Sequence, residues 1–351
     1  MATNQKGRKL TEVNGSAKPR KGGSPTIYDI AALAGVNPST VSRALNTPGR
    51  INAATEAKIR EAAKSLNYQA NPFARALPTG KTKMLAMILA DITNPMFFEP
   101  VRGAEAAASE NGYTFVIAES QESGDQEATA LERVLPAVDG VVMGTSRLPD
   151  ADISAMAQRK SVVLMNRKVE GVMDVVPDTR PGIVQALDHL KSLGHESLAY
   201  LSGPANSWMS DNRWSIIMTE AVSRGMKIVE IGPNEPVVAG GAKSADYVLA
   251  AGVTAVLAYN DLMAIGLLGA LQERGIDIPG QISVIGFDDI FGSNLTRPAL
   301  TTIKSPLREA GELAVQALML EIDGKDSTEV LSGSARLQTS LILRASTAQA
   351  K

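Results

Sequence analysis

The sequence predicts an N-terminal all-α domain of the helix-turn-helix type, followed by an α/β core of two doubly wound lobes with parallel sheets. Three observations support this fold class. Short capped helical patterns run up to residue 66, apolar strands alternate with amphipathic helices after residue 84, and the net charge changes sign between the two parts. With 351 residues, of which 44% are hydrophobic, the chain is long enough for more than one buried core.

The change in charge separates a basic head from an acidic body. Residues 1–83 hold 14 Lys and Arg against 4 Asp and Glu, whereas the remainder holds 21 against 33, so charges of +10 and −12 nearly cancel. This asymmetry indicates that the head binds a polyanion such as nucleic acid. A basic solubilising tail is the alternative, because residues 1–24 are rich in Gly, Lys and Ser and are expected to be disordered.

Composition excludes several functional classes. The chain has no cysteine and two histidines, which rules out disulfides and thiolate chemistry and argues against a metal site or a cofactor. No apolar run is long enough for a membrane span and no apolar leader follows the N-terminal charges, so a cytoplasmic protein is expected. No G-x-G-x-x-G follows the first strand and no phosphate-binding loop motif is present, so an enzyme is not expected.

The N-terminal helices are predicted from caps and apolar spacing. Thr26 and Asp29 have capping-box spacing at the start of the first helix, and Gly35 ends it. A second helix opens with Asn37 as N-cap and Pro38 at its first position, and a third covers about 53–66. Two short helices joined at a glycine match the helix-turn-helix spacing, so residues 25–70 are expected to form a DNA-binding domain.

The second helix is expected to read DNA. Its apolar residues Val41, Ala44 and Leu45 are expected to face inward, which leaves Ser39 and Arg43 on the opposite side. Arg43 can pair bidentately with guanine, a contact that contributes about 1–3 kcal/mol of discrimination. A capped helix with a solvated arginine is the alternative. The DNA-binding residues expected in this domain are Thr26, Pro38, Ser39, Thr40, Ser42, Arg43 and Asn46.

After residue 84 the pattern predicts parallel strands that are covered by helices on both faces. The expected strands are 84–90, 113–118, 140–144, 162–166, 198–203, 255–261 and 282–289. The expected helices are 98–111, 180–193, 211–224 and 261–274. The residues 193–195 are expected to form a hinge between the lobes. Ligands of such sheets bind at the carboxyl ends of strands, where polar residues are therefore candidates for binding.

Three stretches, "TIYDIAALAGVNPSTVSRALN", "LNYQANPFARALPTGKT" and "DITNPMFF", resemble the lac repressor / galactose repressor family of bacterial transcription regulators. The resemblance implies a hinge helix and linker at 71–82 that orders on operator DNA, with Asn71, Ala74 and Leu77 at the minor groove. Leu77 matches the apolar wedge that kinks the central base step. The sequence departs from the family at Pro38 and Ser39, where larger side chains set operator preference.

The resemblance also implies that residues 83–351 form an effector-binding and dimerisation domain with a fold like that of periplasmic sugar-binding proteins. The implied function is a sequence-specific transcriptional regulator, most simply a repressor, of carbohydrate uptake or metabolism genes. A small sugar-like effector would control its affinity for a palindromic double-stranded operator. A homodimer is expected, because the C-terminal "LILRASTAQAK" lacks a leucine heptad for tetramerisation.

Seven positions match or surround the family's ligand contacts. They are Asp91, Phe97, Asp178, Trp208, Arg213, Asn260 and Asp288. Carboxylates and a guanidinium suit a polyhydroxylated ligand, although Arg213 also accepts a carboxylate or phosphate. Alternatively, the Asp and Asn residues only cap helices or end strands and do not bind a ligand. A regulator whose lobes respond to a protein partner or a non-sugar metabolite stays open, as does the choice between induction and co-repression.

Overall fold

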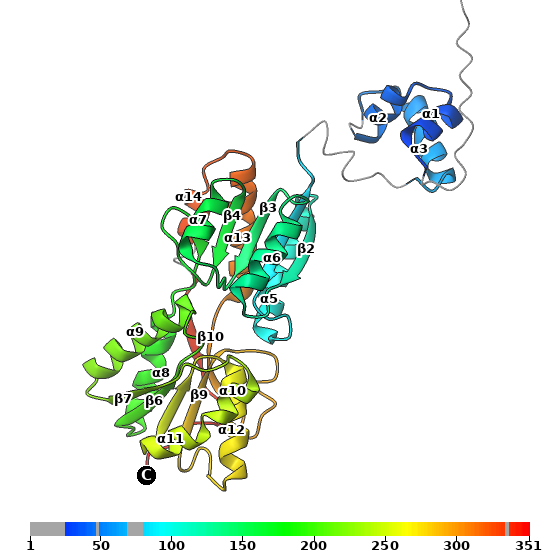
Figure 1. Cartoon of the computed structure of the whole chain (residues 1–351). Coiled ribbons are helices and arrows are strands. Elements are labelled where there is room, and N and C mark those ends of the chain that lie inside the picture. The colour runs from blue at the N-terminus through cyan, green and yellow to red at the C-terminus, as the bar shows by residue number, and fades with distance from the viewer. Residues whose placement is uncertain (1–24, 47–48, 69–79, 334–336) are drawn as a thin grey trace, which may run out of the picture. The chain divides into compact units, whose positions relative to one another are not determined.

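The computed structural model describes residues 25–46, 49–68, 80–333 and 337–351 of the chain. The chain divides into two compact units, residues 1–80 and 81–351 (Figure 1). The change from one unit to the next lies inside the linker expected at 71–82. The expected tail 1–24 and the hinge positions Asn71, Ala74 and Leu77 lie outside the described residues.

The described part of the first unit is helical, as the sequence predicts. Its helices are α1 (Ile27–Ala34), α2 (Pro38–Asn46) and α3 (Ala53–Ser65). They surround a small core, which contains the buried side chains of Ile30, Ala31, Val41, Ala44, Ile59 and Ala62. Each helix contributes two residues to this core, and helices this short depend on such packing for their stability.

Local signals at α1 agree with the predicted boundaries. The Asp29 carboxylate accepts hydrogen bonds from the Thr26 backbone N–H at 2.8 Å and from the Thr26 hydroxyl at 2.7 Å. Gly35 ends the helix with φ 67°, a left-handed conformation that glycine adopts without a steric penalty. The turn to α2 is short, and the backbone N–H groups of Thr40 and Val41 then donate to Asn37 O.

The second unit begins with an all-parallel sheet that forms lobe 1. Its strands are β1 (Met84–Leu89), β2 (Thr114–Glu119), β3 (Gly140–Gly144), β4 (Ser161–Met165) and β5 (Met173–Val175), in the order β2-β1-β3-β4-β5. The central strands β1, β3 and β4 are buried almost throughout, because separate apolar clusters lie on the two faces of the sheet. The sequential elements that cover this sheet are η1 (Pro95–Phe97), α5 (Phe98–Glu110), α6 (Gly124–Val134) and α7 (Asp150–Ala157).

Lobe 2 contains a second, mixed sheet. Its strands are β6 (Ser197–Leu201), β7 (Lys227–Ile231), β8 (Ala255–Ala258), β9 (Ser283–Asp288), β10 (Thr301–Lys304) and β11 (Ser340–Ile342), in the order β11-β10-β9-β8-β6-β7. The pairing is parallel except between β10 and β11. The helices of this lobe are α8 (Arg180–Ser192), α9 (Trp208–Ser223), α10 (Val238–Lys243), α11 (Ala245–Ala251) and α12 (Asp261–Glu273).

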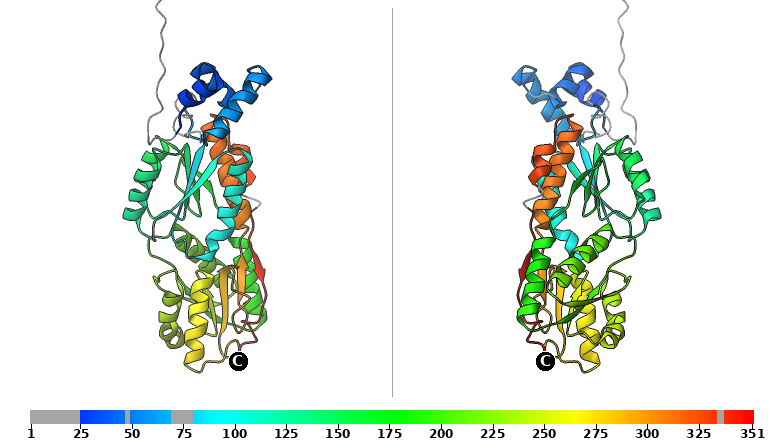
Figure 2. Two further views of the ribbon diagram at one scale, coloured as in Figure 1. Left: turned by 90° about the vertical axis from the view of Figure 1, so that its right-hand side faces the viewer. Right: turned by 90° about the vertical axis from the view of Figure 1, so that its left-hand side faces the viewer.

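Neither lobe is a single continuous segment. The chain passes to lobe 2 between β5 and α8, returns to lobe 1 for α13 (Leu307–Ile322) and α14 (Thr328–Ser332), and passes again to β11. Figure 2 shows α13 in orange beside the much earlier α5, and both helices contribute to the same apolar cluster of lobe 1. The first and last passages are tied together, since Asp178 N–H donates to Leu337 O and Thr339 N–H donates to Asp178 O.

The predicted fold class is confirmed, and the predicted strands match the observed ones to within a few residues. The predicted hinge at 193–195 is wrong. His195 lies inside lobe 2, where its ring contacts Thr254 Oγ1 at 2.8 Å, Ser283 Oγ at 3.0 Å and Ala348 O at 3.0 Å. The glycine that precedes it ends α8 rather than joining two lobes, because α8 already packs in the lobe 2 core.

Candidate nucleic-acid interface and interlobe cleft

Helix α2 turns one side to its core and the other to solvent. Val41 and Ala44 are fully buried, whereas Ser39 and Arg43 are exposed one helical turn apart. The side chains of Pro38, Thr40 and Ser42 are half-buried. A short polar side chain and a guanidinium on one exposed turn form a surface that can donate hydrogen bonds to base edges and phosphates.

Two other predicted DNA contacts of this unit, Thr26 and Asn46, lie outside the exposed turn of Ser39 and Arg43. The Thr26 hydroxyl already donates to Asp29, so this side chain stabilises the start of α1. The side chain of Asn46 lies outside the described part of the chain. Sequence reasoning did not select Tyr28, although its ring is 69% exposed on α1.

The carboxyl ends of strands from both lobes meet around a narrow cleft. The cleft encloses a cavity of about 20 Å³. Its lining residues are Asn94, Met96, Phe97, Glu122, Thr145, Arg147 and Asn166 from lobe 1, and Met209, Arg213, Pro236, Tyr259, Asn260 and Asp288 from lobe 2. Four of the predicted effector contacts therefore come together here, namely Phe97, Arg213, Asn260 and Asp288. A cleft of polar groups with a few aromatic rings is typical of a site for a small polar molecule.

Arg213 is the best-defined polar group of the cleft. One guanidinium nitrogen donates to Asp288 Oδ1 at 3.1 Å and the other donates to Tyr259 O. The guanidinium carbon lies 3.6 Å from the centroid of the Phe287 ring. Burial raises the pKa of Asp288, and the contact with Arg213 opposes that rise. Among the described residues the Nε of Arg213 has no hydrogen-bond partner, so one donor is still available.

Two further predicted contacts are held by local caps. Asn260 is the N-cap of α12, where its side-chain oxygen accepts from Met263 N–H at 2.9 Å and its amide nitrogen donates to Pro236 O at 2.8 Å. Asn260 therefore does cap a helix, which was the alternative role considered from the sequence. This cap also places its amide at the wall of the cleft. On the other side, Asn94 caps the short helix η1 and so presents Phe97, which is buried.

Sequence reasoning missed several lining residues. Glu122, Thr145 and Asn166 follow β2, β3 and β4 and have φ values of 59°, 59° and 56°. Non-glycine residues rarely adopt this left-handed region, and where they do so the strain is often stored at a functional site. Arg147 and Tyr259 complete the missed set. The strand-end rule that selected Asp288 applies equally to these positions and would have found them.

Three predicted effector contacts do not line the cavity. The Asp91 carboxylate accepts from the backbone N–H and the hydroxyl of Thr93. Asp178 lies in the passage between the lobes, and its carboxylate accepts from Arg180 N–H at the start of α8. Trp208 begins α9 and packs against the lobe 2 core. In this conformation Asp91 stabilises a turn, Asp178 stabilises the start of α8, and Trp208 packs at the edge of the lobe 2 core.

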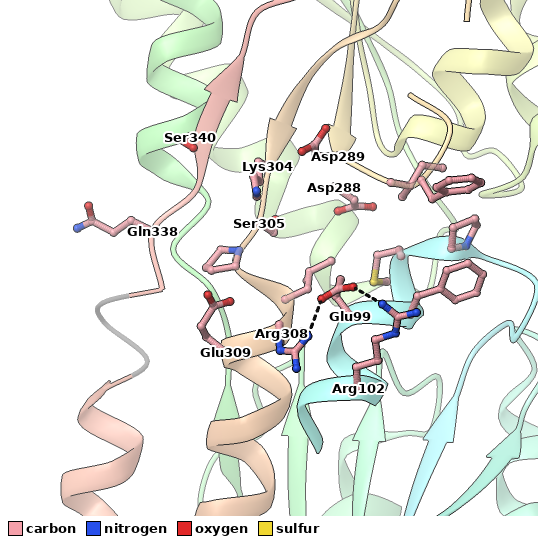
Figure 3. Close-up of a pocket in the computed structure, with 17 residues that line it drawn as sticks. Glu99, Arg102, Asp288, Asp289, Lys304, Ser305, Arg308, Glu309, Gln338 and Ser340 are labelled. Atoms are coloured by element: carbon pink, nitrogen blue, oxygen red, sulfur yellow. Dashed lines mark hydrogen bonds and ion pairs between the residues drawn. The ribbon is translucent and has the colours of Figure 1, made fainter. Parts of the chain in front are cut away.

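A larger cavity of about 740 Å³ borders the narrow cleft, with which it shares Met96 and Asp288. Figure 3 shows that one wall carries Glu99 between two arginines. Glu99 lies 3.5 Å from Arg102 and 3.7 Å from Arg308, and all three side chains are largely exposed. Exposed ion pairs of this kind contribute little to stability, so they mark a solvated wall rather than a closed binding site.

Comparisons with known proteins agree with this geometry. Residues 26–71 match the bacterial regulatory proteins of the lacI family, and residues 187–347 match the periplasmic binding protein-like domain. The regulator GalR of Escherichia coli (strain K12) is 32% identical over 315 residues, which cover 87% of this chain and 91% of GalR. The chain belongs to the lacI family. The repressor CytR of the same organism is 30% identical over 331 residues, covering 92% of this chain and 96% of CytR.

Solved structures extend this lacI-family assignment to both units. The lac repressor dimer bound to operator and the anti-inducer ONPF has 25% identity and a TM-score of 0.81, covering 93% of this chain and all of that one. The CelR–cellobiose complex has 25% identity and a TM-score of 0.66, covering 92% and 99%. This lacI-family chain is therefore a DNA-binding transcriptional regulator and not an enzyme. Within the described ranges, none of the helices combines the length and apolar content needed to cross a membrane.

Proposed function

We propose that this regulator is a cytoplasmic repressor of carbohydrate uptake or metabolism genes, and that a neutral sugar-like effector in the interlobe cleft sets its operator affinity. One observation supports the neutral effector above others. The four charged side chains that line the cleft are already arranged as two buried or partly buried ion pairs, Arg147 with Glu122 at 2.7 Å and Arg213 with Asp288 at 3.1 Å.

These ion pairs select against a charged ligand. A carboxylate or phosphate would have to compete with Glu122 or Asp288 for its arginine, and the displaced carboxylate would be left unpaired in a buried place. Hydroxyl groups donate and accept, so they can bind both members of a pair without changing the charge of the cleft. The rings of Phe97 and Tyr259 offer apolar faces to a sugar ring. Among the relatives, CelR is known as a complex with cellobiose.

On the DNA side, we propose that α2 enters the major groove and that Ser39 and Arg43 contact base edges. Thr26, Pro38, Thr40, Ser42 and Asn46 would position the helix on the phosphates and neighbouring bases, and Asn71, Ala74 and Leu77 would act at the minor groove. The exposed Tyr28 is a further candidate for a phosphate contact.

We also propose that two copies form a symmetric dimer on a palindromic operator. β2 is an edge strand of lobe 1 whose Ile117 is exposed, and Ile92 N–H donates to Glu119 at the end of the same strand. Phe98, at the start of α5, and Phe291, which is 78% exposed, line one cavity. Exposed apolar side chains near an unpaired strand edge are typical of a protein–protein interface.

Selection of bound duplexes from a random DNA library tests the operator proposal. The full chain should enrich a palindrome with a flexible central pyrimidine–purine step. The Arg43→Met variant should lose this enrichment, and Lys58→Met, which removes an exposed basic group from α3, should keep it. Equal enrichment by both variants would mean that α2 does not read bases.

Isothermal titration tests the effector proposal with D-galactose, D-ribose and cellobiose against glucose 6-phosphate and glucuronate. At least one neutral sugar should bind, and Arg213→Met should abolish that binding. Arg224→Met is the matched control, because Arg224 lies at the other end of the same helix, outside the cleft. Stronger binding of the anionic sugars would contradict the neutral-ligand proposal, and silence of the whole panel would favour a protein partner or a non-sugar metabolite.

A further inference from the structure

The cleft residue Asp288 belongs to a turn with an unusual backbone. It ends β9, and Asp289 directly follows it (Figure 3). Their φ values are 103° and 54°, so two consecutive residues other than glycine lie in the left-handed region. Such a conformation is strained and persists only when the surrounding structure holds it. The turn 288–293 therefore needs support from residues outside it.

Asp261 supports this turn from the interior of lobe 2. It is the first residue of α12 and is fully buried. One carboxylate oxygen, Oδ2, accepts from Ile290 N–H at 2.9 Å and from the Ser293 hydroxyl at 2.6 Å. The carboxylate thus binds both the backbone of the turn and one of its side chains. Hydrogen bonds to a carboxylate in the protein interior are stronger than those between neutral groups.

The same carboxylate also contacts the strands that flank the turn. Its Oδ1 accepts from the Thr302 hydroxyl on β10 at 2.6 Å. On β9 it lies against Gly286, where an added Cβ would overlap Oδ1. A glycine at this position is therefore what lets the carboxylate approach the strand so closely. Asp261 joins α12, β9, β10 and the turn at one point.

Arg344 is a second support of the turn. It follows β11, and its guanidinium donates to Asp289 Oδ1 and, at 2.7 Å, to Leu300 O. Its backbone N–H donates to Thr301 Oγ1 at 3.0 Å. Arg344 thus fixes the side chain of Asp289, whereas Asp261 fixes the residues that follow it. The strained end of β9 is held by two buried or partly buried charged groups from distant parts of the sequence.

We propose that Asp261 is a positioning residue of the cleft, which holds the strained turn after β9 so that the Asp288 carboxylate faces Arg213 and the effector. The effector part rests on the proposed function, whereas the support of the turn does not. Without Asp261, the buried donors of the turn lose their acceptor. The turn then relaxes from its strained conformation, and Asp288 is no longer held 3.1 Å from Arg213.

The surroundings of Asp261 decide which variants test the proposal. Burial raises the pKa of Asp261 to about 7, although the hydroxyls of Ser293 and Thr302 oppose the rise. A neutral amide of the same shape is therefore tolerated here. Asp261→Asn keeps one oxygen for the turn and offers N–H groups to Thr302, whereas Asp261→Ala removes every acceptor. Asp246→Ala is the matched control, because Asp246 lies in the first turn of α11 and pairs with the exposed Arg274 instead.

Hydrogen exchange measured by mass spectrometry on the full chain tests the support of the turn without DNA or sugar. The backbone amides of the turn are protected only while the turn stays closed. Asp261→Ala should raise the exchange rate of residues 289–295 about tenfold, and Asp261→Asn should raise it less than about threefold. The control variant should match the parent chain, and so should β1 of lobe 1 in every variant.

Two results would overturn the support of the turn. The turn could exchange at the parent rate in Asp261→Ala, or β8 in the core of lobe 2 could accelerate as much as the turn does, which would mean a general loss of stability. Ser293→Ala removes one hydroxyl and is a smaller change, so it decides the question if Asp261→Ala does not fold. It should raise the exchange rate of the turn about threefold, and an unchanged rate would likewise contradict the proposal.

Titration with cellobiose and D-galactose tests the effector part. For a sugar that binds the parent chain, Asp261→Ala should weaken binding about tenfold, and Asp261→Asn should restore most of the affinity. Unchanged affinity together with faster exchange of the turn would show that Asp261 supports the turn but does not position Asp288 for the ligand. If neither sugar binds the parent chain, the proposed function fails on this panel, and the exchange rates alone decide whether Asp261 holds the turn.

Discussion

The Arg213→Met substitution should lower the free energy of unfolding of lobe 2 by more than the loss of buried surface alone would. The guanidinium and the Asp288 carboxylate are 7% and 5% exposed, so Arg213→Met leaves a carboxylate without a counterion in a place that water hardly reaches. Breaking a buried pair from one side typically costs about 3–5 kcal/mol, whereas removing both charges costs far less. The double variant Arg213→Met with Asp288→Asn should therefore recover most of the loss. Asparagine tolerates the φ of 103° at position 288 better than most residues do.

Urea unfolding followed by tryptophan fluorescence measures this effect. The two tryptophans of the chain, Trp208 and Trp214, lie on α9 with Arg213, so the signal reports the lobe that is perturbed. The loss of unfolding free energy in the Arg213→Met variant should also depend on pH. Burial raises the pKa of Asp288 in the folded state, and losing Arg213 raises it further. The folded variant then binds a proton more tightly than the unfolded chain, so its stability deficit should shrink as pH falls from 8 towards 5.5.

A loss below about 1 kcal/mol in the single variant would refute this reasoning, because it would mean that the remaining groups or water satisfy the carboxylate. A double variant as unstable as the single one would place the cost in lost packing against Phe287 and Tyr259 rather than in the unpaired charge. A deficit that does not change with pH would show that Asp288 stays ionised throughout.

Three further outcomes are expected. Burial lowers the pKa of both His189 and His195, so the unfolded chain takes up protons first, and the urea midpoint should fall as pH drops below about 6.5 and fall less in the His195→Gln variant. In titrations of a selected operator, Arg43→Met should cost about 1–3 kcal/mol and relax sequence preference, whereas Lys58→Met should leave the preference unchanged. Deleting residues 1–24 should weaken DNA binding and flatten its dependence on salt, and an unchanged slope in filter-binding assays would show that this segment does not contact phosphate.

The sequence predicts the central strands of each lobe and the helices of the first unit because these segments carry long, regular signals. It does not predict β5, β7, β10 or β11. The strands β5 and β11 have three residues each, and β7 is a half-exposed edge strand, so neither length nor apolar alternation distinguishes them from loops. It also gives no indication that α13 covers lobe 1, because local spacing shows which face of a helix is buried but not which sheet buries it.

For the candidate site, strand-end position predicted Asp288 and Asn260 but was applied too narrowly. Asn166 directly follows β4 and Thr145 directly follows β3, so the same strand-end rule selects both positions. Asp178 and Asp91 show the opposite error. Each is an acidic residue near a strand end, yet each carboxylate is occupied by local backbone N–H groups. Side-chain type and sequence position alone do not distinguish an acidic residue that lines the cleft from one that binds its own turn, because the geometry of the turn decides between them.

The return of the chain to lobe 1 has a consequence for synthesis on the ribosome. The sheet of lobe 1 is complete at Val175, but α13, which covers one of its faces together with α5, ends at Ile322. At about 5–20 residues per second, the roughly 150 residues between them take about 7–30 s to be made. During that time the apolar surface that α13 later covers is available to chaperones or to neighbouring nascent chains. Slow translation before α13 should therefore reduce the yield of folded protein.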